Sequence, residues 1–231
     1  MPTPNDTEAN PKVTNAATVI VGRDTNDGPS VLMVRRNSKT AFGGMWVFPG
    51  GKVDPEDYDH TGDLRAASRQ AAVREAKEEA DLDLHIDDLV EHSYWAPPLD
   101  IPRRFLTWFY VAHAPDGTAG DVTIDGGEIT DHLWLTPTET LRRHSEGEIE
   151  LAPPTFVTLS NLVQHASMGS LVETHRSIES ERFLTKWITI EGGAVVMWAD
   201  DAGYDTGNPD TAGPRHRVEM RLSGWTYLRS M

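Results

Sequence analysis

Apolar and polar positions alternate in short blocks over the first third of the chain, which is typical of strands joined by tight loops. Two apolar runs are separated by the turn-rich segment DTNDGPS, and a shorter apolar run leads into FPGG. Asp, Glu and Pro are frequent in the segment that follows. We therefore predict strands over residues 16–21 and 31–35, a short apolar piece over 45–48 and an acidic loop over 54–63.

The next segment is rich in Ala, Arg and Glu and contains neither Gly nor Pro. These residue types favour a helix, and Asp63 is a suitable N-cap at its start. We predict a helix from Leu64 to about Ala80.

Strand-like runs return after this helix, beginning with the aromatic and β-branched segment RRFLTWFYVAHA. The predicted strands span 103–114, 128–135, 187–190, 194–198 and 217–228, and the predicted helices span 138–146, 154–166 and 170–180. This mixture predicts an α/β or α+β fold with one mixed sheet. A flexible tail is expected over 1–14, a main domain over 15–150, and an extension packed on the same domain over 151–231.

Composition limits the classes of function that remain. The 231 residues are 38% hydrophobic and 25% charged, as in ordinary soluble domains, and no apolar run approaches the roughly 18 residues of a membrane span. The first residues do not resemble a signal peptide, so we expect a cytoplasmic protein without a membrane partner. The absence of cysteine excludes disulfides and thiolate chemistry, and the net charge of −15 argues against bulk nucleic-acid binding.

Three carboxylates share one face of the predicted helix, because Glu75 lies three and four residues before Glu78 and Glu79. Such neighbours repel one another unless a hard cation neutralises them, and oxygen ligands suit Mg²⁺. Arg74, four residues before Glu78, can orient that carboxylate. The alternative is an ordinary solvated helix face. The Gly50-Gly51 pair, which lets the backbone approach a metal or phosphate closely, is otherwise a simple turn.

FPGG followed by REAKEEADL resembles the Nudix box, G-x5-E-x7-R-E-U-x-E-E-x-G-U, in which U is apolar. The matching positions are Gly51, Arg74, Glu75, Ala76, Glu78, Glu79 and Leu82. The resemblance implies a mixed β-sheet sandwiched between helices, here with a helical and β C-terminal extension. It also implies hydrolysis of a nucleoside diphosphate linked to a group X, with Mg²⁺ or Mn²⁺.

The chain departs from the box in three ways. Residues 52–73 place 22 residues between Gly51 and Arg74, where the usual spacing is 13. Ala66 stands at the position of the early glutamate, and Asp81 replaces the late glycine. The role of the early glutamate either passes to Asp54, Glu56 or Asp57 or is absent.

The resemblance assigns roles residue by residue. Glu75, Glu78, Glu79 and the Gly50 carbonyl would be metal ligands, and Glu128 is the candidate for a further ligand, or else a surface carboxylate. Glu78 or Glu79 would be the catalytic base, with Arg74 beside them.

With its insertion between FPGG and the catalytic helix, the chain resembles the Nudix branch that includes the peroxisomal coenzyme A diphosphatase. The resemblance therefore makes coenzyme A or acyl-CoA the first expected substrate. ADP-ribose or NADH comes next, then nucleoside triphosphates, with a non-catalytic nucleotide sensor as the alternative of another class.

An acidic protein with an anionic substrate needs local cations. The predicted substrate-binding residues are Arg35, Arg36, Lys52 and Arg104, and Lys39 and Arg103 are further candidates. Five aromatic residues could stack on a base or belong to the core: Trp46, Tyr94, Trp95, Trp108 and Tyr110. The helix over 154–166 could pack on the sheet, line the pocket for X or form a homodimer face.

Overall fold

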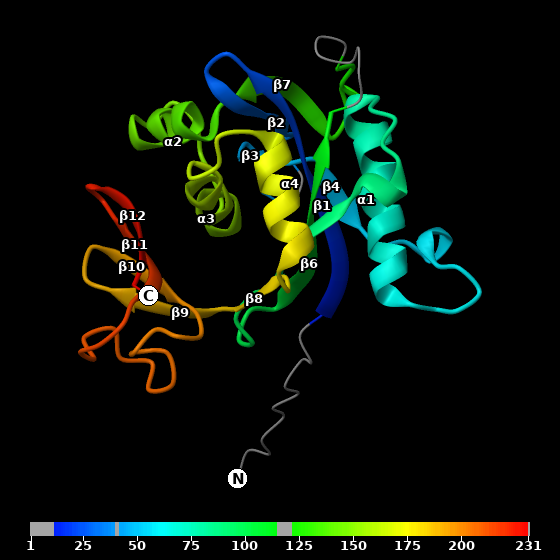
Figure 1. Cartoon of the computed structure of the whole chain (residues 1–231). Helices are drawn as coiled ribbons and strands as arrows, with labels where there is room; N and C mark the ends of the chain where they lie inside the picture. Colours follow the sequence, from blue (N-terminus) through cyan, green and yellow to red (C-terminus); the bar gives the residue numbers. More distant parts are fainter. Residues whose placement is uncertain (1–11, 40–41, 115–121, 231) are drawn as a thin grey trace.

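The computed structural model describes residues 12–39, 42–114 and 122–230. Its main feature is a mixed eight-stranded sheet in the order β3-β2-β1-β6-β5-β8, with β4 also paired to β1 and β7 to β2 (Figure 1). The strands are β1 (Lys12–Thr25), β2 (Gly28–Arg36), β3 (Trp46–Val47), β4 (Gly50–Lys52), β5 (Val90–Ala96), β6 (Arg103–His113), β7 (Ile129–Leu135) and β8 (Glu181–Leu184). β1 runs parallel to β6, and β5 runs parallel to β8.

A second, antiparallel sheet has the order β12-β11-β10-β9. Its strands are β9 (Lys186–Ile190), β10 (Gly193–Met197), β11 (His216–Arg221) and β12 (Gly224–Arg229). The helices are α1 (Leu64–Ala80), α2 (Pro137–Ser145), α3 (Pro153–Leu162) and α4 (Met168–Ser177), with short 3₁₀ turns η1 (Pro55–Asp57) and η2 (Ile86–Asp88).

The main sheet lies between helices, as the resemblance to the Nudix box implies. On one face the small side chains of α1, including Ala72 and Ala76, pack against Val19 and Val21 of β1. The other face buries residues of α3, α4 and the second sheet in a separate cluster, so these elements lie opposite α1 (Figure 1). Within the described ranges, no helix has the length and apolar character to cross a membrane.

The helix that carries the acidic face was predicted correctly at both ends. The Asp63 side chain accepts a hydrogen bond from the backbone N–H of Arg65 and caps the first turn. Asp81 ends the helix in the left-handed conformation, with φ 54°. Asp tolerates this conformation better than most residues, which explains how it can stand where the Nudix box has glycine.

Other boundaries differ from the prediction. Residues 217–228 are not one strand but the hairpin of β11 and β12, which turns at Leu222 and Ser223 before Gly224 at φ 129°. β5 and β8 were not predicted, and α3 and α4 begin and end earlier than expected. Residues 12–14, predicted as tail, extend β1 beside β6, while the rest of that predicted tail lies outside the described residues.

Candidate active site

Glu79 is the buried member of the acidic face, with 3% of its surface exposed. The Gly50 backbone N–H donates to its Oε2 at 2.9 Å, and Arg36 Nη1 donates to its Oε1 at 3.0 Å. Burial raises the Glu79 pKa to about 8, although Arg36 and the Gly50 N–H oppose the change. Residues of β4 and β2 therefore hold both carboxylate oxygens of Glu79 in place.

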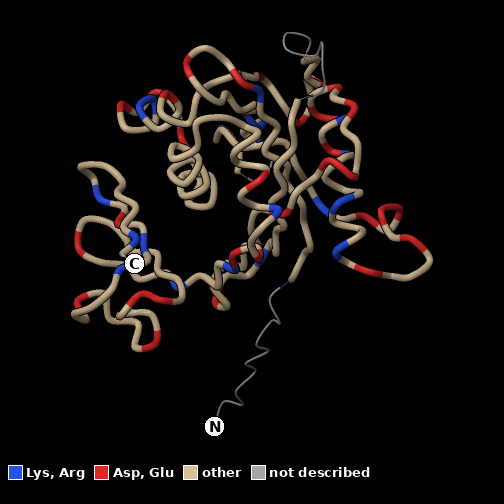
Figure 2. The backbone as a smooth tube through the Cα atoms, in the orientation of Figure 1, with Lys and Arg blue, Asp and Glu red and all other residues tan. Residues whose placement is uncertain are grey.

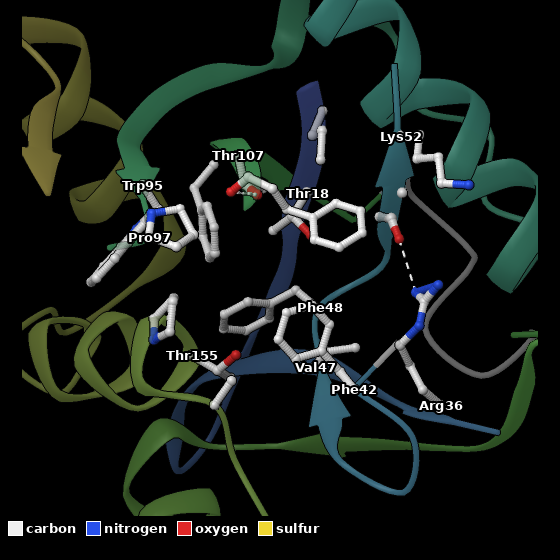
Figure 3. A pocket seen from close by; sticks show the side chains of 18 of the residues that line it. Thr18, Arg36, Phe42, Val47, Phe48, Lys52, Trp95, Pro97, Thr107 and Thr155 are labelled. Carbon is white, nitrogen blue, oxygen red and sulfur yellow. Dashed lines mark hydrogen bonds between the residues drawn. The ribbon is translucent and has the colours of Figure 1, made fainter. Parts of the chain in front are cut away.

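Arg36, at the end of β2, joins three acceptors to which the resemblance assigns a role as metal ligands. Its guanidinium donates to the Gly50 carbonyl at 3.0 Å, to Glu79 at 3.0 Å and to Glu128 Oε2 at 3.1 Å. Figure 3 labels Arg36 and draws a hydrogen bond from its guanidinium. These oxygens come from β4, α1 and the residue just before β7, and they converge on one positive group.

Arg74 organises the other side of the acidic face. It binds Asp57 with two hydrogen bonds, of 3.0 and 2.9 Å, and donates to Glu75 at 2.9 Å and to Glu78 at 3.1 Å. The hydrogen bonds to Asp57 are the main cause that raises the Arg74 pKa. Of the three acidic residues near the insertion, Asp57 is therefore the buried partner of Arg74, while Glu56 is exposed and Asp54 lies 3.7 Å away.

Gly51 makes room for Glu75. A Cβ atom on Gly51 would lie 2.2 Å from Glu75 Oε1, so a side chain there would displace this carboxylate. Burial raises the Glu75 pKa, as it does for Glu79. The close backbone approach explains why glycine is required at this point of FPGG.

The donor set fits a hard divalent cation, because carboxylate and carbonyl oxygens surround a point that a guanidinium now occupies. Within the described ranges, no three acidic or histidine side chains are already gathered as a metal cluster, since Arg36 and Arg74 lie between the carboxylates. Figure 2 shows acidic residues along α1 and along the neighbouring loop. Cation binding would relieve the repulsion among them.

A cavity of about 1000 Å³ connects this acidic site to the opposite face of the sheet. Figure 3 shows Arg36 and Lys52 on one side of it and Trp95 and Pro97 on the other. The lining includes all of the predicted metal and catalytic positions: Gly50, Arg74, Glu75, Glu78, Glu79 and Glu128. The cavity thus brings together residues of β4, α1 and the bend just before β7.

The predicted substrate-binding residues separate into two groups. Arg36 and Lys52 line the cavity, whereas Arg35 and Arg104 are not among its lining residues. The Arg104 guanidinium instead binds the Pro97 carbonyl at 3.1 and 2.9 Å and holds the loop between β5 and β6. Arg103 lines the cavity in its place. Neighbouring strand residues point to opposite faces, so a choice between Arg103 and Arg104 required the register.

Of the five aromatic candidates for base stacking, Trp95 is the one that lines the cavity in the described part of the chain. Trp46 is buried in the core opposite α1. Tyr110 is buried toward α1, with its hydroxyl 2.6 Å from Ser68 Oγ, and Tyr94 packs on Trp108. Sequence reasoning missed Phe42 and Trp187 as lining residues, because neither lies near the acidic motif.

Comparison with known proteins gives a match over the part of the chain that contains α1 and its acidic residues. A family model described as NUDIX domain matches residues 13–154. The acyl-coenzyme A diphosphatase NUDT19 of Xenopus laevis is 32% identical over 137 residues, which cover 56% of this chain and 35% of that protein. The protein of the same name from Gallus gallus is 31% identical over 134 residues, covering 55% and 35%.

The fold has a solved counterpart. The crystal structure of a NUDIX hydrolase from Alicyclobacillus acidocaldarius is similar with a TM-score of 0.61 and 24% identity, covering 74% of this chain and 98% of that one. The chain spans between 35% and 60% of the length of the first three curated relatives.

Proposed function

The chain belongs to the Nudix family, and from this we propose that it is a pyrophosphohydrolase that cleaves the diphosphate of coenzyme A or an acyl-CoA. The observation that carries the proposal is the convergence of Glu79, Glu128 and the Gly50 carbonyl on one cationic group at the end of a large cavity. The two diphosphatases of about 32% and 31% identity support the choice of substrate.

In this proposal Mg²⁺ or Mn²⁺ would be held by Glu75, Glu79, Glu128 and the Gly50 carbonyl, and Glu78 would stay free to accept a proton. The bound ion would supply neutralisation of charge on the diphosphate and a lower pKa for the attacking water. Arg36, released from Glu79 when the ion takes its place, would turn to the diphosphate oxygens together with Lys52. Both side chains already line the cavity.

Glu78 is the better candidate for the proton acceptor. Its side chain is 58% exposed and contacts Arg74 at 3.1 Å, so it is oriented but open to water. Glu79 is held on both oxygens by Gly50 and Arg36 and is suited to ligation. Glu78 would take the proton of the attacking water as the water oxygen forms a bond to phosphorus and the bridging P–O bond to the leaving phosphate breaks.

The test is product analysis by mass spectrometry with Mg²⁺ or Mn²⁺. Coenzyme A, acetyl-CoA, ADP-ribose, NADH and dGTP would be supplied separately, with Glu78→Gln as the inactive control. We expect adenosine 3′,5′-bisphosphate and a 4′-phosphopantetheine product from coenzyme A or acetyl-CoA. Preferential cleavage of ADP-ribose or NADH would show that this compound, and not coenzyme A, is the substrate. Metal-dependent binding without any cleavage would favour a nucleotide sensor.

A further inference from the structure

The cavity has a second end that the diphosphate chemistry does not use. Residues from Ala152 onward contribute eight lining positions, and none of them is ionisable: Ala152, Pro153, Pro154, Thr155, Thr185, Trp187, Val196 and Trp198. The family match ends at residue 154, so much of this wall belongs to the C-terminal extension. Across from it lie Phe48, Trp95 and Phe109 of the main sheet region. We call the space between Phe48, Trp95, Phe109, Trp187, Val196 and Trp198 the apolar chamber.

Two of the chamber's three indole N–H groups already have hydrogen-bond partners. Trp198 Nε1 donates to Thr185 Oγ1 at 3.1 Å, and Trp95 Nε1 donates to Ser93 Oγ at 2.9 Å. The ionisable lining residues come instead from earlier parts of the chain, including α1, β4 and the loop before β6. A nucleobase or sugar would find few hydrogen-bond partners in the chamber, whereas a hydrocarbon chain would lose nothing by entering it.

The chamber wall is firmly attached to the main sheet. The Trp95 and Phe183 rings stack at 3.8 Å, and Trp198 meets both rings edge-on at 5.5 and 5.3 Å. These contacts join β5 and β8 to Trp198, the residue that directly follows β10. Trp187 pairs with Val196 across β9 and β10 but remains 45% exposed, so it is the chamber residue most available to a ligand.

We propose that the apolar chamber binds the acyl chain of an acyl-CoA while its diphosphate lies at the acidic end, and that Trp187 is a specificity-determining residue. The inference rests on the proposed function for the position of the diphosphate. Burial of hydrocarbon then tightens binding about two- to fourfold for each methylene group that leaves water. Acyl-CoA should bind better than free coenzyme A.

The experiment measures binding by titration calorimetry in EDTA, so that turnover does not interfere. Coenzyme A, acetyl-CoA, hexanoyl-CoA and decanoyl-CoA would be compared on wild type, Trp187→Ala and Leu222→Ala. Leu222 is a matched control, because it is 97% exposed in the turn between β11 and β12 and is not among the residues that line this cavity. Trp187→Leu, which keeps an apolar side chain, serves as a second variant.

We expect the Kd to fall at least about 30-fold from acetyl-CoA to decanoyl-CoA in wild type and in Leu222→Ala. Trp187→Ala should lose at least about fivefold of that gain with little change for free coenzyme A, and Trp187→Leu should lose less. A Kd independent of chain length, or an equal change for all ligands in Trp187→Ala, would overturn the inference.

Turnover with Mg²⁺ separates the two proposals. Tighter binding of long-chain acyl-CoA without any cleavage would contradict the proposed function and support the acyl-chain site. Cleavage of coenzyme A without any effect of chain length on Kd would support the proposed function and contradict the acyl-chain site.

Discussion

Glu78 and Glu79 are adjacent in sequence, yet the fold gives them different surroundings. Glu79 is buried, and the Gly50 N–H and Arg36 donate hydrogen bonds to it. The Glu78 side chain is 58% exposed and contacts Arg74. The repulsion expected among such carboxylates is offset by Arg36 and Arg74, one on each side of the face. Single substitutions should therefore separate ligation from proton transfer.

Glu78→Gln should lower kcat at least about a hundredfold with a small change in metal affinity, because the amide cannot accept the proton. Glu79→Gln should lower kcat by a similar factor and also weaken metal binding, since it removes a charged ligand. Steady-state kinetics and Mn²⁺ titration by electron paramagnetic resonance measure the two effects. A folded Glu79→Gln protein with full activity would contradict the role given to this residue.

At the scale of elements, the insertion between FPGG and α1 is fastened to the helix. η1 presents the buried Asp57 to Arg74, whose guanidinium also donates to the Lys52 carbonyl of β4 at 3.0 Å. One side chain of α1 thus connects three segments of the site. The orientation of Glu75 and Glu78 depends on this connection, because both bind the same guanidinium.

Asp57→Asn should reduce the free energy of unfolding by about 1–3 kcal/mol and lower kcat, because it leaves Arg74 without its charged partner. Glu56→Gln is the matched control, since it makes the same chemical change at an exposed position one residue away. Urea unfolding and steady-state kinetics of both variants provide the measurement. Equal behaviour of the two variants would show that the Asp57–Arg74 pair does not organise the site.

A second element-level feature is the packing of α4 on β5. His92 lies at the bulge of β5, is buried, and packs its ring 4.4 Å from that of His175 on α4, with His165 near His175. Burial, followed by the two neighbouring histidines, lowers the His92 pKa to about 3 from its ordinary value of 6.5. Burial also lowers the pKa of His175, which Glu181 partly opposes, and that of His165.

Acid should therefore destabilise the fold through His92. Below about pH 6.5 the unfolded chain binds a proton that the folded chain does not bind until about pH 3, so the free energy of unfolding falls over this window. The loss from His92 should reach about 2 kcal/mol at pH 5 relative to pH 7. In urea unfolding, His92→Leu should be less pH-dependent than wild type, while His85→Asn, at a side chain 72% exposed, should not differ. A steep dependence that survives in His92→Leu would place its origin elsewhere.

At the scale of the whole molecule, local pattern was enough to predict the acidic helix and a mixed sheet, and the resemblance to the Nudix box added helices on both faces of that sheet. α1 is long, uninterrupted and capped at Asp63, so composition and capping agreed. The hairpin of β11 and β12 was missed because a two-residue turn interrupts an otherwise strand-like run. β5 was missed because its bulge at His92 and its polar residues break the alternation of a half-buried strand.

The site residues that share one motif could be predicted from the sequence. The contacts between residues far apart in the sequence could not. Glu75, Glu78 and Glu79 follow from helical spacing alone. The pairing of Arg36 with Glu79 joins β2 to α1, and the position of Trp187 depends on how a separate sheet packs. No local pattern specifies such contacts, since they depend on how segments distant in the sequence pack on the main sheet.

A cation can stabilise this protein in two ways: it can bind the folded site, or it can screen the net charge of −15. The last prediction separates the two effects. Mg²⁺ at about 100 times its Kd should add about 2.7 kcal/mol to the free energy of unfolding and raise Tm by about 5–10 °C. NaCl at equal ionic strength screens the same net charge without occupying the site, so it should raise Tm less. Differential scanning calorimetry of wild type and Glu79→Gln distinguishes these effects, because the variant should keep the NaCl response and lose most of the additional gain from Mg²⁺. Identical responses to the two salts would show that the carboxylates of α1 are a solvated surface and not a cation site.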